Sequence, residues 1–140
     1  MPCASAACGL RRTLPATLEA IEAFLIEFKR SACPAERADR FAAELLLREA
    51  LTNAVVHGCR SDANKQIRCA VRFGPAVLLI RVKDDGEGFD WRSAQRCGAS
   101  LTECSGRGLE ILRCYATHVR FNNKGNVLTI LKRFKKGKPQ

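Results

Sequence analysis

The chain has 140 residues and a net charge of +10, and its 46% hydrophobic content is typical of a single globular domain with one core. Its apolar runs, such as residues 76–80, are far shorter than the roughly 18 residues of a membrane-spanning helix, and its first residues lack the basic-then-apolar order of an export signal. We therefore predict a cytoplasmic protein without membrane contact, whose eight cysteines, none in a CxxC pair, are free thiols rather than disulfides or zinc ligands.

The first part of the chain predicts a short strand followed by an amphipathic helix. Residues 10–14 suit an edge strand, and Pro15 suits the first turn of a helix. From residue 16 to about residue 32, apolar side chains recur at intervals of three and four, at Leu18, Ile21, Leu25 and Phe28. We expect Pro34 to end this helix.

A second helix is predicted over residues 35–58, and it carries polar side chains beside its buried face. One row at intervals of four holds Leu45, Glu49, Asn53 and His57. Glu49 and Asn53 lie next to small alanines, where a carboxylate and an amide are costly unless something pairs with them. We expect Gly58 to end the helix as a left-handed cap.

The middle of the chain predicts a hairpin and then a long loop. Residues 67–73 alternate apolar with polar or small side chains, Gly74-Pro75 turns the chain, and residues 77–82 form the partner strand. Residues 89–105 have no clean period and predict a mobile loop of a length that often serves as a lid. In this loop, Cys97 and Cys104 are at most candidates for oxidation.

The last part of the domain predicts a helix and a second hairpin. Gly106-Arg107-Gly108 opens a helix at residues 109–116, and strands at 118–122 and 126–134 flank a turn. The whole chain then has three helices and about five strands. This is an α+β two-layer sandwich, in which a mixed, mostly antiparallel sheet is covered by helices on one face.

The positive charge is uneven along the chain. Half of the excess lies in the last nine residues, at Lys132, Arg133, Lys135, Lys136 and Lys138. A solvated end is favoured over a nucleic-acid-binding tail, because only Phe134 interleaves with these charges. We predict a flexible N-terminus at 1–9, one domain at 10–134, a basic tail at 135–140, and no specific nucleic-acid partner.

The pair Glu49 and Asn53 suits chemistry on a metal–nucleotide complex. Mg²⁺ prefers oxygen ligands and keeps several waters, so the Asn53 amide oxygen together with triphosphate oxygens suits this ion. Glu49, one turn away, is placed to accept a proton from an attacking hydroxyl or to orient a water. The alternative is that both are helix polar groups satisfied by neighbouring backbone.

Two glycine-containing segments suit the rest of a nucleotide. Asp84 follows an apolar strand, where its carboxylate can accept the exocyclic amino proton of adenine, while Gly86 and Gly88 let backbone approach a ligand. Alternatively, this segment is a simple turn. Gly106 and Gly108 at a helix start leave N–H groups that suit phosphate, and Arg107 adds a positive charge. Taken alone, this segment is explained better by a capped helix start.

Taken together, the three segments resemble the motifs of a known family. ELLLREALTNAVVHG resembles the N box, VKDDGEGFD the first glycine box and SGRGLEIL the second glycine box of the GHKL superfamily of ATPases, which includes gyrase, the heat-shock chaperone, histidine kinases and MutL. The run E-A-x-x-N-A-x-x-H-G and the compact length resemble in particular the small bacterial anti-sigma factor serine/threonine kinases. The resemblance covers about residues 10–134.

This resemblance implies a Bergerat-type sandwich with ATP held between the helices and a mobile lid. It implies that Asn53 coordinates Mg²⁺, that Glu49 is the catalytic base and that Asp84 recognises adenine, while the nucleotide pocket is shaped by Gly86, Gly88, Gly106 and Gly108. It also implies a homodimer that binds a sigma factor and phosphorylates a STAS-type anti-anti-sigma protein. One departure is Gly125-Asn126, where the family often has Gly-Thr, so we expect an adjusted ATP affinity.

The function expected from the sequence is that of an ATP-dependent serine/threonine protein kinase acting as a switch. Neither the P-loop nor the eukaryotic kinase pattern occurs, and His57 and His118 lie inside the domain rather than on an N-terminal dimerisation helix. The alternative is a non-catalytic ATP-binding anti-sigma or adaptor module, against which the intact Glu49 argues. A third hypothesis, a nucleic-acid binder using its tail, predicts salt-dependent binding that is lost on deleting residues 132–140.

Overall fold

The computed structural model describes residues 8–31, 37–74, 76–88 and 104–134, with backbone only for residues 104–109. The predicted loop at 89–105 lies almost wholly outside the described residues, as do the tail at 135–140 and most of the predicted flexible segment at 1–9. No helix in the described parts of the chain is long and apolar enough to cross a membrane. The described side chains of Cys59, Cys69 and Cys114 are free thiols, as predicted, whereas the side chains of Cys97 and Cys104 fall outside the description.

The described residues form five strands and three α-helices. Their order is β1 (Cys8–Pro15), α1 (Leu18–Arg30), α2 (Arg37–Asn53) with the π-helical turn η1 (Ala54–Gly58), β2 (Gln66–Phe73), β3 (Val77–Asp84), α4 (Cys104–Tyr115), β4 (His118–Phe121) and β5 (Val127–Arg133). The sheet has the order β1-β2-β3-β5-β4, which confirms β1 as an edge strand. Every described strand pair is antiparallel, so the predicted mixed sheet is antiparallel throughout this part of the chain.

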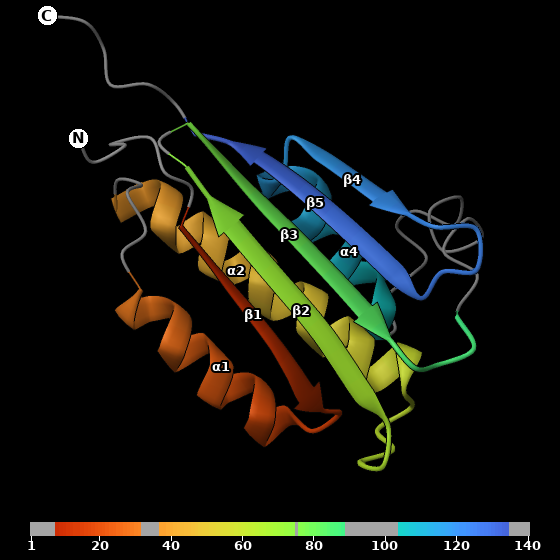
Figure 1. Cartoon of the computed structure of the whole chain (residues 1–140). Coiled ribbons are helices and arrows are strands. Elements are labelled where there is room, and N and C mark those ends of the chain that lie inside the picture. The colour runs from red at the N-terminus through yellow and green to blue at the C-terminus, as the bar shows by residue number, and fades with distance from the viewer. Residues whose placement is uncertain (1–7, 32–36, 75, 89–103, 135–140) are drawn as a thin grey trace, which may run out of the picture.

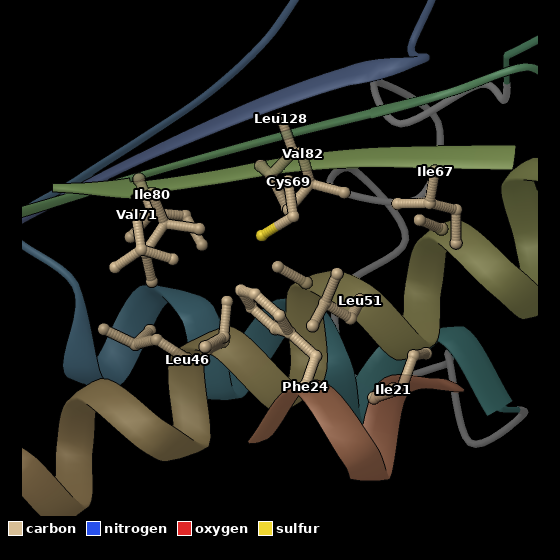
Figure 2. Packing of buried hydrophobic residues seen from close by; sticks show 14 of the residues in the cluster. Ile21, Phe24, Leu46, Leu51, Ile67, Cys69, Val71, Ile80, Val82 and Leu128 are labelled. Atoms are coloured by element: carbon tan, nitrogen blue, oxygen red, sulfur yellow. The ribbon is translucent and has the colours of Figure 1, made fainter. Parts of the chain in front are cut away.

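The helices lie against one face of the sheet, and the other face is open (Figure 1). Alternation along the strands sets this arrangement: in β2 the residues at Ile67, Cys69, Val71 and Phe73 are buried, and those between them are mostly exposed. Figure 2 shows β2 and β3 side chains such as Val71 and Ile80 pointing toward Leu46 of α2 and Phe24 of α1. The predicted two-layer α+β sandwich is confirmed.

The start of α1 differs from the prediction. Pro15 is the last residue of β1 rather than part of the first helical turn, and Thr17 caps the helix by accepting the N–H of Ala20 at 3.1 Å. Leu18, which was assigned to the buried face, is 54% exposed, and Phe24 fills the core instead. Leu18 is the first residue of α1, and the spacing of apolar residues alone does not reveal that it is exposed there.

Candidate functional site

The carboxylate of Asp84 is the one buried charged side chain in the described part of the chain, with only 5% of the residue exposed. It occupies the last position of β3, on the parity that faces the helices. Its Oδ1 accepts the backbone N–H of Gly86 at 2.7 Å, while no group in the described residues donates to Oδ2. Burial raises the pKa of Asp84, and the Gly86 N–H partly opposes this by favouring the charged form.

A small pocket opens beside Asp84, and Asn53 lies in its wall. The lining residues come from the end of α2, from β3 and from the β4–β5 hairpin: Ala50, Asn53, Ala54, Gly58, Val82, Asp84, Phe121, Gly125, Asn126 and Leu128. Two residues predicted from separate motifs therefore share one pocket. The Asn53 side chain makes no capping bond to the adjacent helical turn, so its amide is not consumed as a helix cap.

Gly58 lies directly against the Asp84 carboxylate because the end of α2 widens into a π-helical turn. In this turn the N–H of Cys59 reaches back to the carbonyl of Ala54 at 2.8 Å. Left-handed backbone occurs two and three residues later, at Arg60 and Ser61, so the predicted left-handed cap at Gly58 is wrong. A Cβ at Gly58 would collide with both carboxylate oxygens of Asp84, and glycine is needed for this close approach.

The two glycines after Asp84 pack against other backbone segments. A Cβ at Gly86 would collide with the carbonyl oxygen of Gly58, and a Cβ at Gly88, which has a φ of 90°, would collide with the carbonyl oxygen of Lys124. We predicted that these glycines allow backbone to approach a ligand. In the described structure they let the segment after β3 pack against the backbone of the helix end and of the β4–β5 turn, and neither glycine lines the pocket.

Glu49 lies one helical turn before Asn53 on α2, outside the set of residues that line the pocket. Its side chain is half-buried, and among the described residues no hydrogen-bond donor contacts its carboxylate. Burial raises the pKa of Glu49, and the neighbouring Arg48 guanidinium partly offsets this increase. The predicted base therefore stands beside the pocket with a carboxylate that is more basic than that of an exposed glutamate.

The second glycine box coincides with the start of α4, with a shift in register. The helix begins at Cys104, so Gly106, Arg107 and Gly108 lie inside it rather than before it. Gly106 is in the first turn, where N–H groups have no intrahelical acceptor and suit an anion, whereas Gly108 is already in the second turn. The side chain of Arg107 lies outside the described residues.

Two asparagines hold the β4–β5 turn against Asp84: Asn122, which the sequence reasoning missed, and Asn126, which it noted only as a departure from the family pattern. The side-chain oxygen of Asn122 accepts the N–H groups of Gly125, Asn126 and Val127 at 2.8, 2.9 and 3.0 Å. Asn126 donates its side-chain amide to the carbonyl of Asp84 at 3.3 Å, and its own carbonyl accepts the N–H of Asp84 at 3.0 Å. The asparagine that departs from the family pattern therefore braces the backbone of Asp84. The available signal was the ability of asparagine to bond backbone groups in turns.

The donor set of the pocket suits the adenine end of ATP and Mg²⁺ bound through phosphates. The Asp84 carboxylate lies against Gly58 and can accept a proton from an amino group, while the cavity between the described residues has a volume of about 10 Å³, which is space for a water rather than for a ring. Within the described residues, no group of three or more His, Cys, Asp or Glu side chains could hold a metal by itself. An ion held by the Asn53 amide together with phosphates and water agrees with the usual coordination of Mg²⁺.

Comparison with known proteins agrees with this geometry. The model of the histidine kinase-like ATPase domain family matches residues 12–132, a span that contains all three motif segments. No curated protein matched the sequence. The match extends over most of the chain, from within β1 to within β5, and the antiparallel sheet with helices on one face is consistent with the fold of this superfamily. The chain therefore belongs to the histidine kinase-like ATPase domain family.

Proposed function

We propose that this protein is an ATP-dependent serine/threonine protein kinase of the anti-sigma factor type. Domains of its family bind ATP, usually with Mg²⁺, and use it in kinase-type reactions. The observation that carries the proposal is the buried Asp84 in a pocket shared with Asn53. A buried carboxylate is costly unless a partner compensates it, and the exocyclic amino group of adenine supplies such a partner.

In the proposed phosphoryl transfer, each residue in or beside the pocket has a separate role. Asp84 accepts the adenine amino proton, and Asn53 supplies an oxygen ligand for Mg²⁺. Bound Mg·ATP supplies the phosphoryl group and neutralises its charge. Glu49, with its raised pKa, accepts the proton of the attacking serine or threonine hydroxyl. The first turn of α4, with Gly106, offers N–H groups to phosphate oxygens.

The partners proposed for this kinase follow from the resemblance of residues 49–58 to the small anti-sigma factor kinases. In this proposal the chain forms a homodimer in the cytoplasm, sequesters a sigma factor and phosphorylates a STAS-domain anti-anti-sigma protein. Phosphorylation would add roughly two negative charges to the STAS partner and release it, which returns the kinase to the sigma factor. Such a system switches between two partners of one ATP-binding domain.

The test is transfer of label from ATP, with magnesium, to a STAS-domain protein encoded beside the gene. We expect label on a serine or threonine of that protein with the wild type. Glu49→Gln should retain ATP binding and lose transfer by roughly 10²–10⁴-fold, the usual contribution of a general base. The matched control is Glu44→Gln on the same helix, which should leave transfer within a factor of two or so because Glu44 forms exposed ion pairs with Lys29 and Arg48.

A second candidate function is an ATP-binding adaptor that sequesters its partner without phosphorylating it. The observation that favours it is that the pocket is lined by Asn53 and Asp84 but not by Glu49. This candidate predicts that the wild type binds ATP and a sigma factor and yields no labelled STAS protein. It also predicts that Glu49→Gln binds the sigma factor as tightly as the wild type does in the presence of ATP.

A further inference from the structure

The face of the sheet that the helices leave open is strongly basic. Its outward-pointing strand positions include seven exposed cationic side chains: Arg11, Arg68, Arg72, Arg81, Lys83, Arg120 and Arg133. No described strand residue on this face is acidic, and no described residue forms an ion pair with any of the seven. The positive excess of the folded domain is therefore concentrated on one side of the sheet.

Four of these arginines surround one small residue. Ala70 lies opposite Arg11 of β1 on one side and opposite Arg81 of β3 on the other. Arg68 and Arg72 precede and follow Ala70 by two residues along β2, so they point to the same face. All five residues line one hollow, to which Lys83 and Leu79 also contribute. The alanine leaves space at the centre, and the four guanidinium groups surround that space.

On the helical side of the sheet, several cations form ion pairs with carboxylates. Arg48 pairs with Glu22 and Glu44, and Lys29 pairs with Glu44 at 3.2 Å. Arg12, which belongs to β1 but has the inward parity, pairs with Glu27 of α1. These three cations are balanced by nearby carboxylates, whereas the seven cations of the open face form no ion pair with any described residue. Such an arrangement is stabilised by an external polyanion.

We propose that the open sheet face binds the phosphodiester backbone of nucleic acid without regard to base sequence. Six of the seven cations are arginine, whose forked guanidinium matches phosphate oxygens in pairs. The cations extend from β1 to β4 across four inter-strand spacings of about 4.8 Å, which suits a linear polyanion rather than one phosphate group.

The outward strand positions of this face lack aromatic side chains, and this limits the choice of ligand. They include no Phe, Tyr or Trp, so bases have no aromatic platform on which to stack, and contact is limited to the backbone. The apolar pair Leu79 and Leu131 lies on this face without the aromatic side chains that are enriched at the centre of protein–protein interfaces. This proposal goes beyond the proposed kinase function and is independent of it, because the Asp84 pocket opens on the helical side of the sheet.

Fluorescence anisotropy of the full chain with short labelled duplexes of two unrelated sequences, at a series of salt concentrations, tests the proposal. We expect equal affinities for the two sequences and a log–log salt slope of about −0.9 for each phosphate neutralised. The triple variant Arg68→Gln, Arg72→Gln, Arg81→Gln should weaken binding at least tenfold at low salt and reduce the slope by about two to three. All three side chains are exposed, so the unfolding midpoint should stay within a few degrees of that of the wild type.

Matched controls separate the open face from net charge and from the basic tail. The triple variant Arg30→Gln, Arg40→Gln, Arg113→Gln makes the same charge change at exposed positions of the helices and should alter affinity less than threefold. Deleting residues 135–140 should leave most of the binding in place. If the deletion removes all binding, or if the two triple variants weaken binding equally, the proposal is wrong. It is also overturned if polyglutamate or vesicles of anionic lipid bind the open face more tightly than duplexes of equal charge do.

Discussion

The two faces of the sheet are built by the same strands and have opposite chemistry. In β3, Ile80 is fully buried against the helices, and the next residue, Arg81, is fully directed to solvent on the open face. The buried residues of the covered face are apolar except at Asp84, while Arg12 and Lys132 share its parity but are not buried. The open face is cationic, and none of its described strand positions holds an acidic residue. On each face, the candidate for function is the feature that packing and solubility do not require. On the covered face this is the Asp84 carboxylate among apolar residues, and on the open face it is the set of seven cations without ion pairs to any described residue.

The largest effect should come from truncating the covered face, and the neighbouring open-face position provides the contrast. Ile80→Ala removes a fully buried side chain from the core and should lower the free energy of unfolding by about 2–5 kcal/mol. Arg81→Ala, one residue later, should change it by no more than about 0.5 kcal/mol. Urea unfolding measures both. Similar losses for the two variants would contradict the assignment of faces.

The next largest effect should come from Gly86, the glycine that packs against the backbone of Gly58. Gly86→Ala places a Cβ against the carbonyl of Gly58, and backbone cannot move aside as a flexible side chain can, so we expect a loss of about 2–3 kcal/mol in unfolding free energy. Gly74→Ala is the matched control, since a Cβ at Gly74 meets nothing within 4 Å and its φ is not positive. Its stability should be unchanged or slightly higher. Equal stability of the two variants would remove the packing role of Gly86.

Substituting Asp84, the buried carboxylate, should affect nucleotide binding more than it affects stability. Asp84→Asn keeps a side-chain oxygen for the Gly86 N–H but loses the charged acceptor, so ATP affinity should fall by about 1.5–3 kcal/mol, roughly 10–150-fold. The pKa of Asp84 is raised in the folded state, so the associated stability is present below the ordinary aspartate pKa and is lost as pH rises through the raised value.

The neutral amide of Asp84→Asn avoids the cost of burying a charge, so we expect this variant to gain stability relative to the wild type as the pH rises. Thermal unfolding at neutral and at acidic pH measures this, and the stability difference between the two proteins should narrow in acid. The matched control is Asp85→Asn, an exposed carboxylate that accepts the N–H of Gln66, and it should keep ATP affinity. A large loss of stability in Asp84→Asn at neutral pH would mean that the charge stabilises the fold.

The smallest effect should come from a paired cation on the helical side. Arg48→Gln removes ion pairs to Glu22 and Glu44 that are partly exposed, so we expect a loss of less than about 1 kcal/mol. Glu22 and the other carboxylates raise the pKa of Arg48 further, so the charge is constant over the accessible pH range. The effect should shrink in high salt, and urea unfolding at low and high ionic strength measures it. A loss that does not depend on salt would indicate packing by the Arg48 stem.

The helices and strands could be predicted from the sequence because the spacing of apolar residues indicates them. The alternation in residues 67–73 and the turn residues after it predict the β2–β3 hairpin. The predicted bounds of the first two helices and of the last hairpin lie within a few residues of the observed ones, whereas α4 begins five residues before the predicted start at residue 109. The site residues Asn53 and Asp84 were also predicted, because the sequence alone shows a polar residue at a position where the apolar pattern predicts a buried side chain. Their shared pocket confirms that the two motifs converge.

What could not be predicted depends on backbone conformation or on contacts between distant segments. The sequence does not reveal the π-helical turn that places Gly58 against Asp84, because the same residues also suit an ordinary capped helix. The bracing of Asp84 by Asn126 joins residues 42 positions apart. The basic open face could not be predicted either, because its arginines alternate with buried residues along the strands. In addition, the net charge of the domain does not show on which face the positive charges lie.

The central claim is that the Asp84 pocket receives the adenine of ATP, and calorimetric titration with Mg·ATP and with Mg·GTP tests it most directly. Guanine carries a carbonyl oxygen where adenine carries the amino group, and a carboxylate cannot donate to that oxygen. We predict binding heat with Mg·ATP and an affinity for Mg·GTP that is at least about tenfold lower, a preference that Asp84→Asn relaxes. Equal affinities for the two nucleotides, or no heat with Mg·ATP, would contradict this account.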